Sequence, residues 1–210
     1  QKTAYEIRLS LVGSEMCIRD SLKPGAVTRD KSLGELTDHG LFFEHVDWFN
    51  TRAYSMGLGN IYLNLVGREP EGIVKPGGED VMVLERLRRD LLALRDPETN
   101  KAVVRSAYVG KEIYHGSCAD RSADLVVGFD EGYRVSWQTC LGGTPEGVFA
   151  VNDRKWSGDH CSLDPAITPG VIFSNKPLGA GPHAIIDVAP TILSRFDIAK
   201  PEVMDGRTWW

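Results

Sequence analysis

The sequence has no long hydrophobic run and no excess of basic residues. No apolar stretch approaches the roughly 18 residues that a membrane-spanning helix needs, so no transmembrane segment is expected. Acidic residues outnumber basic ones, 29 against 24, and the formal net charge is −5 without any basic run. Binding to a nucleic-acid polymer is therefore not expected.

Cysteine is also scarce, with four in 210 residues. Cys17 belongs to the opening segment, which leaves Cys118, Cys140 and Cys161 in the rest of the chain. Their spacing fits neither a zinc ribbon nor a CxxC redox motif, and an odd number rules out a complete set of disulfides within this stretch. The compartment, periplasmic or cytoplasmic, therefore stays open.

Residues 1–21 read better as translated adapter than as protein. Charged residues interrupt every apolar stretch, so the segment lacks the apolar run of about seven residues that a secretory signal requires. Residues 1–6 match CAG AAG ACG GCA TAC GAG, and residues 11–20 match CTC GTG GGC TCG GAG ATG TGT ATA AGA GAC. Both resemble parts of a short-read sequencing adapter. We therefore expect residues 1–21 to be an artefact, disordered and outside the fold.

Residues 22–210 are then expected to be the C-terminal part of a domain whose N-terminal portion is missing. Residues 80–94 place leucines and valines at helical spacing opposite a charged face, which predicts a helix. β-Forming residues predict strands near 61–65, 101–110 and 123–137. Within the last of these, the apolar run "ADLVVGF" is typical of a central strand buried on both faces.

Two further elements are expected near the C-terminus. "PGVIFSN", residues 169–175, predicts a second buried strand. "HAIIDVAPTILSRF", residues 183–196, predicts a helix against the sheet, with Asp187 near its start where a carboxylate favours the helix dipole. Alternating strands and helices indicate an α/β fold with a largely parallel or mixed sheet flanked by helices.

The stretch most suggestive of chemistry is "KWSGDHCSLDPAITPGVIFSN". His160 follows a glycine and an aspartate in an expected loop that leads into an apolar segment, and loops on rigid scaffolds commonly carry ligands and catalytic groups. Asp159 could orient the imidazole of His160 or support a metal ligand. An equally weighted alternative is that Asp159 only caps a turn.

This stretch, together with "IIDVAPTILSRFDIAKPEVMDGR", resembles the C-terminal end of the type I phosphodiesterase/nucleotide pyrophosphatase family, in the alkaline phosphatase superfamily. "DWFNTRAYSMGLGNIYLNLVGREPEGIV" and "ADLVVGFDEGYRVSWQ" resemble interior segments of the same family. The resemblance extends over nearly all of residues 22–207. It implies part of an alkaline-phosphatase-like sheet flanked by helices.

The resemblance also implies a hydrolase with two divalent metal ions, usually zinc, that cleaves phosphodiester or pyrophosphate bonds in a small-molecule substrate. A Thr or Ser nucleophile would attack phosphorus while the cations stabilise the attacking and leaving oxygens. Of the family's metal ligands only one maps onto this chain, as His160. The nucleophile and the other ligands lie upstream in such proteins, so no catalytic residue is expected within residues 22–210, and this chain alone is expected to be inactive.

A second motif, "TDHG", resembles the metal-binding "SDHG" of that family through Asp38 and His39. A metal-binding pair of this kind should follow a buried strand, whereas the preceding "RDKSLGEL" is polar. The pair also lies closer to "VDWFNTRAY" than the family pattern places it. A surface loop is therefore favoured over metal binding for Asp38 and His39.

Other functions remain open on the same scaffold. A sulfatase or a phosphoglycerate-mutase-like enzyme would share the superfamily fold. A non-catalytic relative would keep the fold and bind an anion or a partner protein. The residues that separate these alternatives are the expected upstream Asp, Thr or Ser, and D-x-x-x-H.

Overall fold

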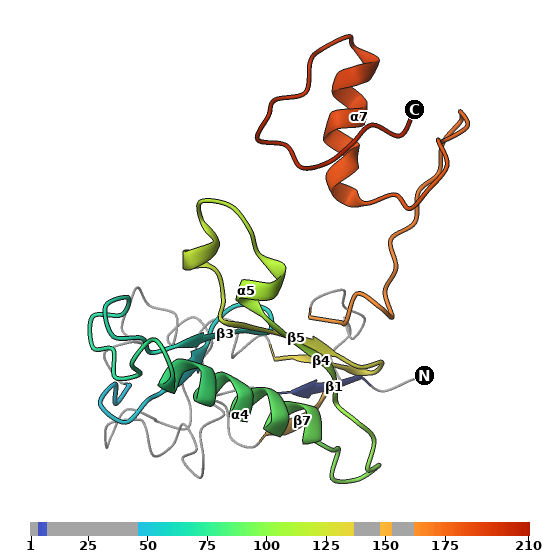
Figure 1. The fold of residues 1–210 in the computed structure, drawn as a ribbon. Helices are drawn as coiled ribbons and strands as arrows, with labels where there is room; N and C mark the ends of the chain where they lie inside the picture. The colour runs from blue at the N-terminus through green and yellow to red at the C-terminus, as the bar shows by residue number, and fades with distance from the viewer. Residues whose placement is uncertain (1–3, 8–45, 137–147, 153–161) are drawn as a thin grey trace, which may run out of the picture. The chain divides into compact units, whose positions relative to one another are not determined.

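The computed structural model describes residues 4–7, 46–136, 148–152 and 162–210, with backbone only for 4–7. The chain divides into two compact units, the first ending at Thr168 and the second spanning Pro169–Trp210 (Figure 1). Among the described residues, no helix is both long enough and apolar enough to cross a membrane.

The first unit is built on a four-stranded antiparallel sheet. Its strands are β2 (Ala53–Ser55), β3 (Asn60–Leu63), β5 (Leu125–Phe129) and β4 (Val104–Val109), in that spatial order. Every neighbouring pair runs antiparallel. β2 and β3 form a hairpin whose connection contains Gly57 and Gly59 at φ 77° and 82°, a conformation that favours glycine. These two glycines therefore make the tight connection between β2 and β3 possible.

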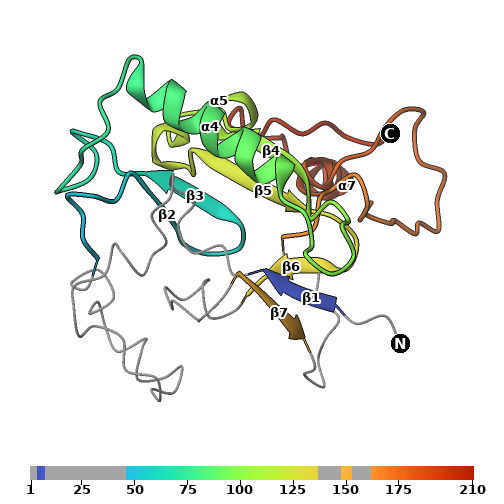
Figure 2. The same ribbon diagram turned by 90° about the horizontal axis from the view of Figure 1, so that it is seen from below.

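The helix predicted at residues 80–94 is confirmed as α4 (Glu79–Ala93). It covers one face of the sheet (Figures 1 and 2). Leu84, Leu87 and Leu91 lie three or four residues apart, so they share one side of the helix and are buried in the core against the sheet residues. The charged side chains of Arg86, Arg88, Arg89 and Asp90 lie on the rest of its surface and form exposed or half-exposed ion pairs.

Two short helices and a three-stranded sheet complete the first unit. β4 leads directly into α5 (Gly110–Ile113), and η1 (Ala119–Arg121) precedes β5. The small sheet has the order β6-β1-β7, formed by β6 (Tyr133–Val135), β1 (Ala4–Ile7) and β7 (Phe149–Asn152). β1 is parallel to β6 and antiparallel to β7, so this sheet is mixed.

β1 differs from the expectation that residues 1–21 stand outside the fold. Ala4–Ile7 exchange backbone pairings with both β6 and β7. The codon match concerns the origin of the segment and not its ability to pair, because any extended segment can offer N–H and C=O groups to exposed strand edges. The remainder of residues 1–21 lies outside the described residues.

The second unit contains η2 (Ile185–Asp187) and α7 (Val188–Arg195), which confirms the helix predicted in residues 183–196. The strand predicted at "PGVIFSN" is wrong: residues 169–175 form no strand, and Val171 and Phe173 are 83% and 93% exposed. Apolar composition favours a strand only where a partner completes the hydrogen-bond ladder, and none pairs with these residues. The packing of α7 against the sheet stays a prediction.

The described residues thus confirm a mixed helix-and-strand, α/β composition. The central, doubly buried character predicted for "ADLVVGF" is also confirmed, because β5 has a neighbour on each side and four of its five residues are buried. The expectation of a largely parallel or mixed sheet is wrong for the four-stranded sheet, which is antiparallel throughout, and it fits the three-stranded sheet, which is mixed. A continuous apolar run indicates that both faces of a strand are buried. It does not indicate whether the neighbouring strands run parallel or antiparallel to it.

Candidate functional site

All four residues proposed from the sequence as metal ligands or their supports lie outside the described residues. These are Asp38, His39, Asp159 and His160. Of the remaining histidines, His115 is exposed, and His183 stacks at a tilt on Trp209, with ring centroids 5.4 Å apart. The structure describes the chain from Ser162 onward, and His160 itself lies outside the described residues.

The chain that follows His160 is attached to the C-terminal end of β5. Phe129 N donates to Ser162 O at 2.9 Å, and Asp164 N donates to Phe129 O at 3.0 Å, so Leu163 pairs with Phe129 in a parallel bridge. Val135 N donates to Ser162 Oγ at 3.0 Å, which adds a link to β6. Residues 162–164 are thus fixed to β5 by main-chain bonds and to β6 through the Ser162 hydroxyl.

The Asp164 side chain adds a third attachment, to β4. Its Oδ2 accepts a hydrogen bond from Tyr108 Oη at 2.9 Å, and its Oδ1 accepts one from Ala166 N at 2.8 Å. Burial opposes ionisation of this fully buried carboxyl, but hydrogen bonds from Ala166, Ser106 and Tyr108 and the charge of Arg105 outweigh it and lower the pKa of Asp164. The carboxylate is therefore satisfied internally as an anion.

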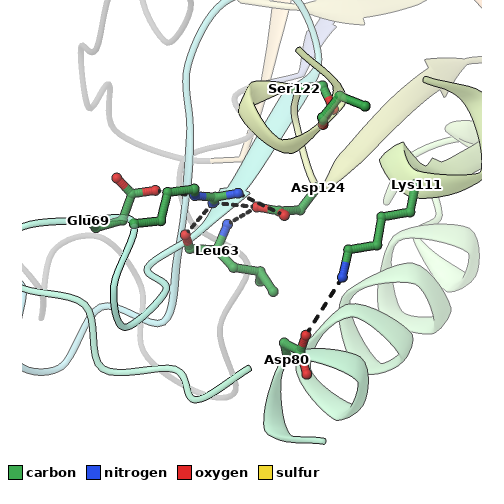
Figure 3. A network of polar contacts seen from close by, with 8 residues as sticks. Leu63, Glu69, Asp80, Lys111, Ser122 and Asp124 are labelled. Atoms are coloured by element: carbon green, nitrogen blue, oxygen red, sulfur yellow. Dashed lines mark hydrogen bonds and ion pairs between the residues drawn. The ribbon is translucent and has the colours of Figure 1, made fainter. Parts of the chain in front are cut away.

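An ionic cluster around Arg68 lies at the opposite end of β5, next to Asp124, which precedes that strand; Figure 3 shows the Glu69, Leu63 and Asp124 members of the cluster. The Asp124 carboxylate accepts from Arg68 Nη1 at 3.0 Å and Arg68 Nη2 at 2.6 Å, a bidentate pair. Arg68 Nε donates to Glu69 Oε1 at 2.8 Å, and Arg68 Nη2 also donates to Leu63 O at 2.7 Å. Asp124 Oδ2 accepts a further bond from Leu63 N at 2.7 Å.

This cluster is a structural clamp and not a free anion site. Two carboxylates and a carbonyl already occupy the donors of Arg68, which leaves little of the guanidinium to bind a phosphate. Desolvation lowers the pKa of Arg68, but the bonds to Asp124 and Glu69 raise it overall. Burial, together with the charge of Glu69, raises the pKa of the neighbouring Tyr54, so that phenol stays protonated.

Two other ion pairs have similarly structural roles. Arg52 lies 3.3 Å from Glu79 at the start of α4, with its side chain 56% exposed. Lys111 reaches to 4.0 Å from Asp80 (Figure 3), whose Oδ1 accepts from Gly78 N at 2.8 Å at the N-terminus of the same helix. Both acidic residues are placed where the helix dipole favours a carboxylate.

The closing motif of the second unit is held by Asp187. Its Oδ1 accepts from Arg207 N and its Oδ2 from Ala184 N, both at 2.9 Å. Trp209 N donates to Thr191 Oγ1 at 3.2 Å, which ties the end of the chain to α7. The "DVAPT" and "MDGR" segments, which carry the family resemblance, therefore contact one another through a buried carboxylate.

Acid should destabilise the protein through four buried aspartates whose pKa values lie below 3.8, Asp80, Asp96, Asp164 and Asp187. A lowered folded-state pKa contributes stability that is present above the unfolded value and is lost as pH falls through the folded value. We expect the thermal midpoint, followed by circular dichroism, to be nearly constant from about pH 8 to 5 and to fall steeply below about pH 4. A midpoint that stays level down to pH 3 would contradict this assignment.

The described residues contain no group of three or more His, Cys, Asp or Glu side chains arranged to hold a metal ion. The sequence analysis did not predict that acidic residues such as Asp96 and Asp164 would be buried as internally hydrogen-bonded carboxylates. Asp164 and Asp96 each precede a proline in "LDPA" and "RDPE", and an Asp-Pro pair is a turn signal that could have indicated their capping role. No local signal pairs Arg68 with Asp124, because 56 residues separate them.

Comparisons of this chain with protein-family models, with curated proteins and with solved structures found no match.

Proposed function

We propose that the intact protein hydrolyses phosphodiester or pyrophosphate bonds with the help of two divalent metal ions, zinc in the first instance, and that this chain is part of an alkaline-phosphatase-like domain. The observation that supports the proposal is the attachment of Ser162 and Leu163 to the C-terminal end of β5. A rigid strand end of this kind is a common support for binding and catalytic residues.

Covalent geometry limits how far His160 can lie from that support. Two residues span at most about 7 Å of extended chain, which is the upper limit on the distance between the Cα atoms of His160 and Ser162. The proposal gives His160 the role of metal ligand and gives Asp159 the role of orienting its imidazole. Asp38 and His39 have no part in it.

The described residues do not form a metal site by themselves, since they contain no group of three or more His, Cys, Asp or Glu side chains that could hold a metal ion. The proposal therefore assigns the nucleophile and the remaining ligands to the reading frame upstream of Leu22. When bound, the two cations would stabilise the attacking and leaving oxygens of an in-line displacement. What this chain supplies is the rigid support under one ligand.

The test uses the complete reading frame of the source gene, expressed with whatever precedes Leu22. The substrate is bis(p-nitrophenyl) phosphate with added zinc, and p-nitrophenyl sulfate and 3-phosphoglycerate serve as substrates for the sulfatase and mutase alternatives. We expect zinc-dependent phosphodiester cleavage that falls more than about 100-fold in His160→Ala. His115→Ala, which alters an exposed histidine, should match the wild type.

Three results would overturn the proposal. Cleavage that is equal in the His160→Ala and His115→Ala variants would remove His160 from the site. A folded wild type that turns over the sulfate ester or phosphoglycerate, and not the phosphodiester, would assign the protein to one of the other classes. A folded protein inactive on all three substrates would favour a non-catalytic binding protein.

A separate expectation concerns residues 22–210 expressed alone. They should show no metal-dependent turnover, because the nucleophile and most ligands are proposed to lie upstream. The measurement is the same phosphodiesterase assay, run at high protein concentration with and without zinc. Zinc-dependent cleavage together with cooperative unfolding would show that these residues contain a complete site.

A further inference from the structure

The side chain of Asp164 joins the segment after His160 to β4, because it accepts a hydrogen bond from Tyr108. We propose that Asp164 is a positioning residue, which acts with Tyr108 and Gly128 to fix the C-terminal side of the segment that carries Asp159 and His160. This role rests on the proposed function, since it matters for catalysis only if His160 does. Asp164 is fully buried, so it acts through its neighbours and does not touch substrate.

A socket for the carboxylate exists because residue 128 is a glycine. A Cβ added at Gly128 would lie 2.4 Å from Asp164 Oδ2 and 3.0 Å from its Cβ and Cγ. The backbone of Gly128 needs no left-handed conformation, so close approach by Asp164 is the reason that the structure shows for glycine here. An alanine at this position would have to displace the whole carboxyl group, which two hydrogen bonds hold in place.

The walls of the socket come from β4. Ser106 lies opposite Gly128 in the ladder, and Tyr108 is two residues further along, so their side chains share one face of the sheet. The register shifts between Val104 and Ser106, which marks a bulge at Arg105. A bulge turns the side chains that follow it, and here Tyr108 of β4 donates its hydroxyl to Asp164 at 2.9 Å.

The anchor extends from Ser162 to Thr168. The main chain of Phe129 bonds Ser162 O and Asp164 N, and Val135 N donates to the Ser162 hydroxyl, while Ile167 N and Thr168 Oγ1 donate to Asp164 O at 3.0 and 3.1 Å. Strands β4, β5 and β6 therefore hold residues 162–164, and residues 166–168 are bonded in turn to Asp164. Loosening Asp164 should loosen that whole segment.

The chain offers a matched control in Asp96 and Tyr133. Tyr133 Oη donates to the buried Asp96 carboxylate at 2.8 Å, and Glu98 N and Thr99 N donate to the same carboxylate at 2.8 Å. The chemistry equals that of the Tyr108–Asp164 pair, but it supports the turn after α4. Tyr108→Phe and Tyr133→Phe each remove one tyrosine-to-aspartate hydrogen bond, and only the first is part of the anchor.

The experiment has two readouts. Hydrogen exchange on the 210-residue chain should show amides 162–168 exchanging at least about tenfold faster in Tyr108→Phe than in the wild type, and unchanged in Tyr133→Phe. In the complete reading frame, Tyr108→Phe and Gly128→Ala should lower kcat for bis(p-nitrophenyl) phosphate about tenfold, with KM within about twofold, because anchoring affects geometry rather than binding. Tyr133→Phe should keep the wild-type kcat.

The outcomes separate this inference from the proposed function. If the wild type turns over and the two tyrosine variants lose kcat or exchange protection equally, the role of Asp164 is only structural and the inference is wrong. It is also wrong if Asp164→Ala retains the wild-type kcat. An inactive, folded wild type would overturn the proposed function and the positioning role together, which is a different result from failure of the anchor alone.

Discussion

Asp124→Ala is expected to destabilise the protein by about 2 kcal/mol, because it leaves a partly buried cation without its bidentate partner. The substitution removes both oxygens that bind the Arg68 guanidinium and the acceptor for Leu63 N. The Asp124 side chain is 11% exposed and that of Arg68 is 25% exposed, so water can replace only part of what is lost. Urea unfolding followed by circular dichroism measures the change in free energy of unfolding.

The control for this prediction is Asp90→Ala on the exposed face of α4. Asp90 lies 3.6 Å from Arg86 in an i,i+4 pair, with exposed fractions of 41% and 53%. Pairs of this kind contribute about 0.5 kcal/mol or less. Equal destabilisation by Asp90→Ala and Asp124→Ala would show that burial does not set the strength of the Arg68 cluster, and the structural assignment of that cluster would fail.

Asn64→Asp is the second change expected to have a large effect, about 3 kcal/mol or more. Asn64 is fully buried, and its Nδ2 donates toward the carbonyl oxygens of Trp48, Thr51 and Glu71 at 3.1, 2.9 and 3.1 Å. An aspartate would present an oxygen to three acceptors in a site without water access. The loss of stability should shrink as pH falls, because the protonated acid can donate one hydrogen bond.

Asn100→Asp provides the comparison for that variant. Asn100 is exposed and adopts φ 57°, a conformation that asparagine and aspartate both tolerate. Its substitution should change the free energy of unfolding by less than about 0.5 kcal/mol. A small effect at Asn64, similar to that at Asn100, would contradict the three-carbonyl site described for Asn64.

Local sequence patterns predicted the elements that bury one regular face. Leu84, Leu87 and Leu91 identify α4 because their spacing matches the helical period, and the apolar run of "ADLVVGF" identifies β5 as central. The direction of the neighbouring strands could not be predicted, since it depends on connections and not on composition. The strand expected at "PGVIFSN" failed for a related reason, because pairing with a partner is a property of the whole fold.

The site was predicted less completely than the fold. His160 and Asp159 were chosen from a motif, and their placement lies outside the described residues. The residues that support them could not be predicted from local sequence patterns. Asp164 bonds to Tyr108, which is 56 residues away in the chain, and a glycine is needed at position 128 only because Asp164 packs against it. Residues that cap turns or pack against a buried side chain leave only weak patterns in the local sequence. The anchor around Asp164 could therefore be identified only from the structure.

Codon identity and backbone pairing give different information about residues 1–21. The codons indicate an adapter, whereas Ala4–Ile7 pair with β6 and β7. Both statements hold if a short extended segment fills the space between two strand edges regardless of its origin. None of residues 1–21 belongs to the proposed metal site or to the anchor around Asp164.

The most direct test of the central proposal is to resequence the source locus with adapter sequences removed and to read the codons upstream of Leu22. A metal-dependent phosphodiesterase predicts a strand that ends in aspartate, a Thr or Ser at the start of a helix, a D-x-x-x-H pair and a strand that ends in "SDHG". An upstream region that is present but encodes other residues at those positions would contradict the proposed metal chemistry and leave His160 without a catalytic role.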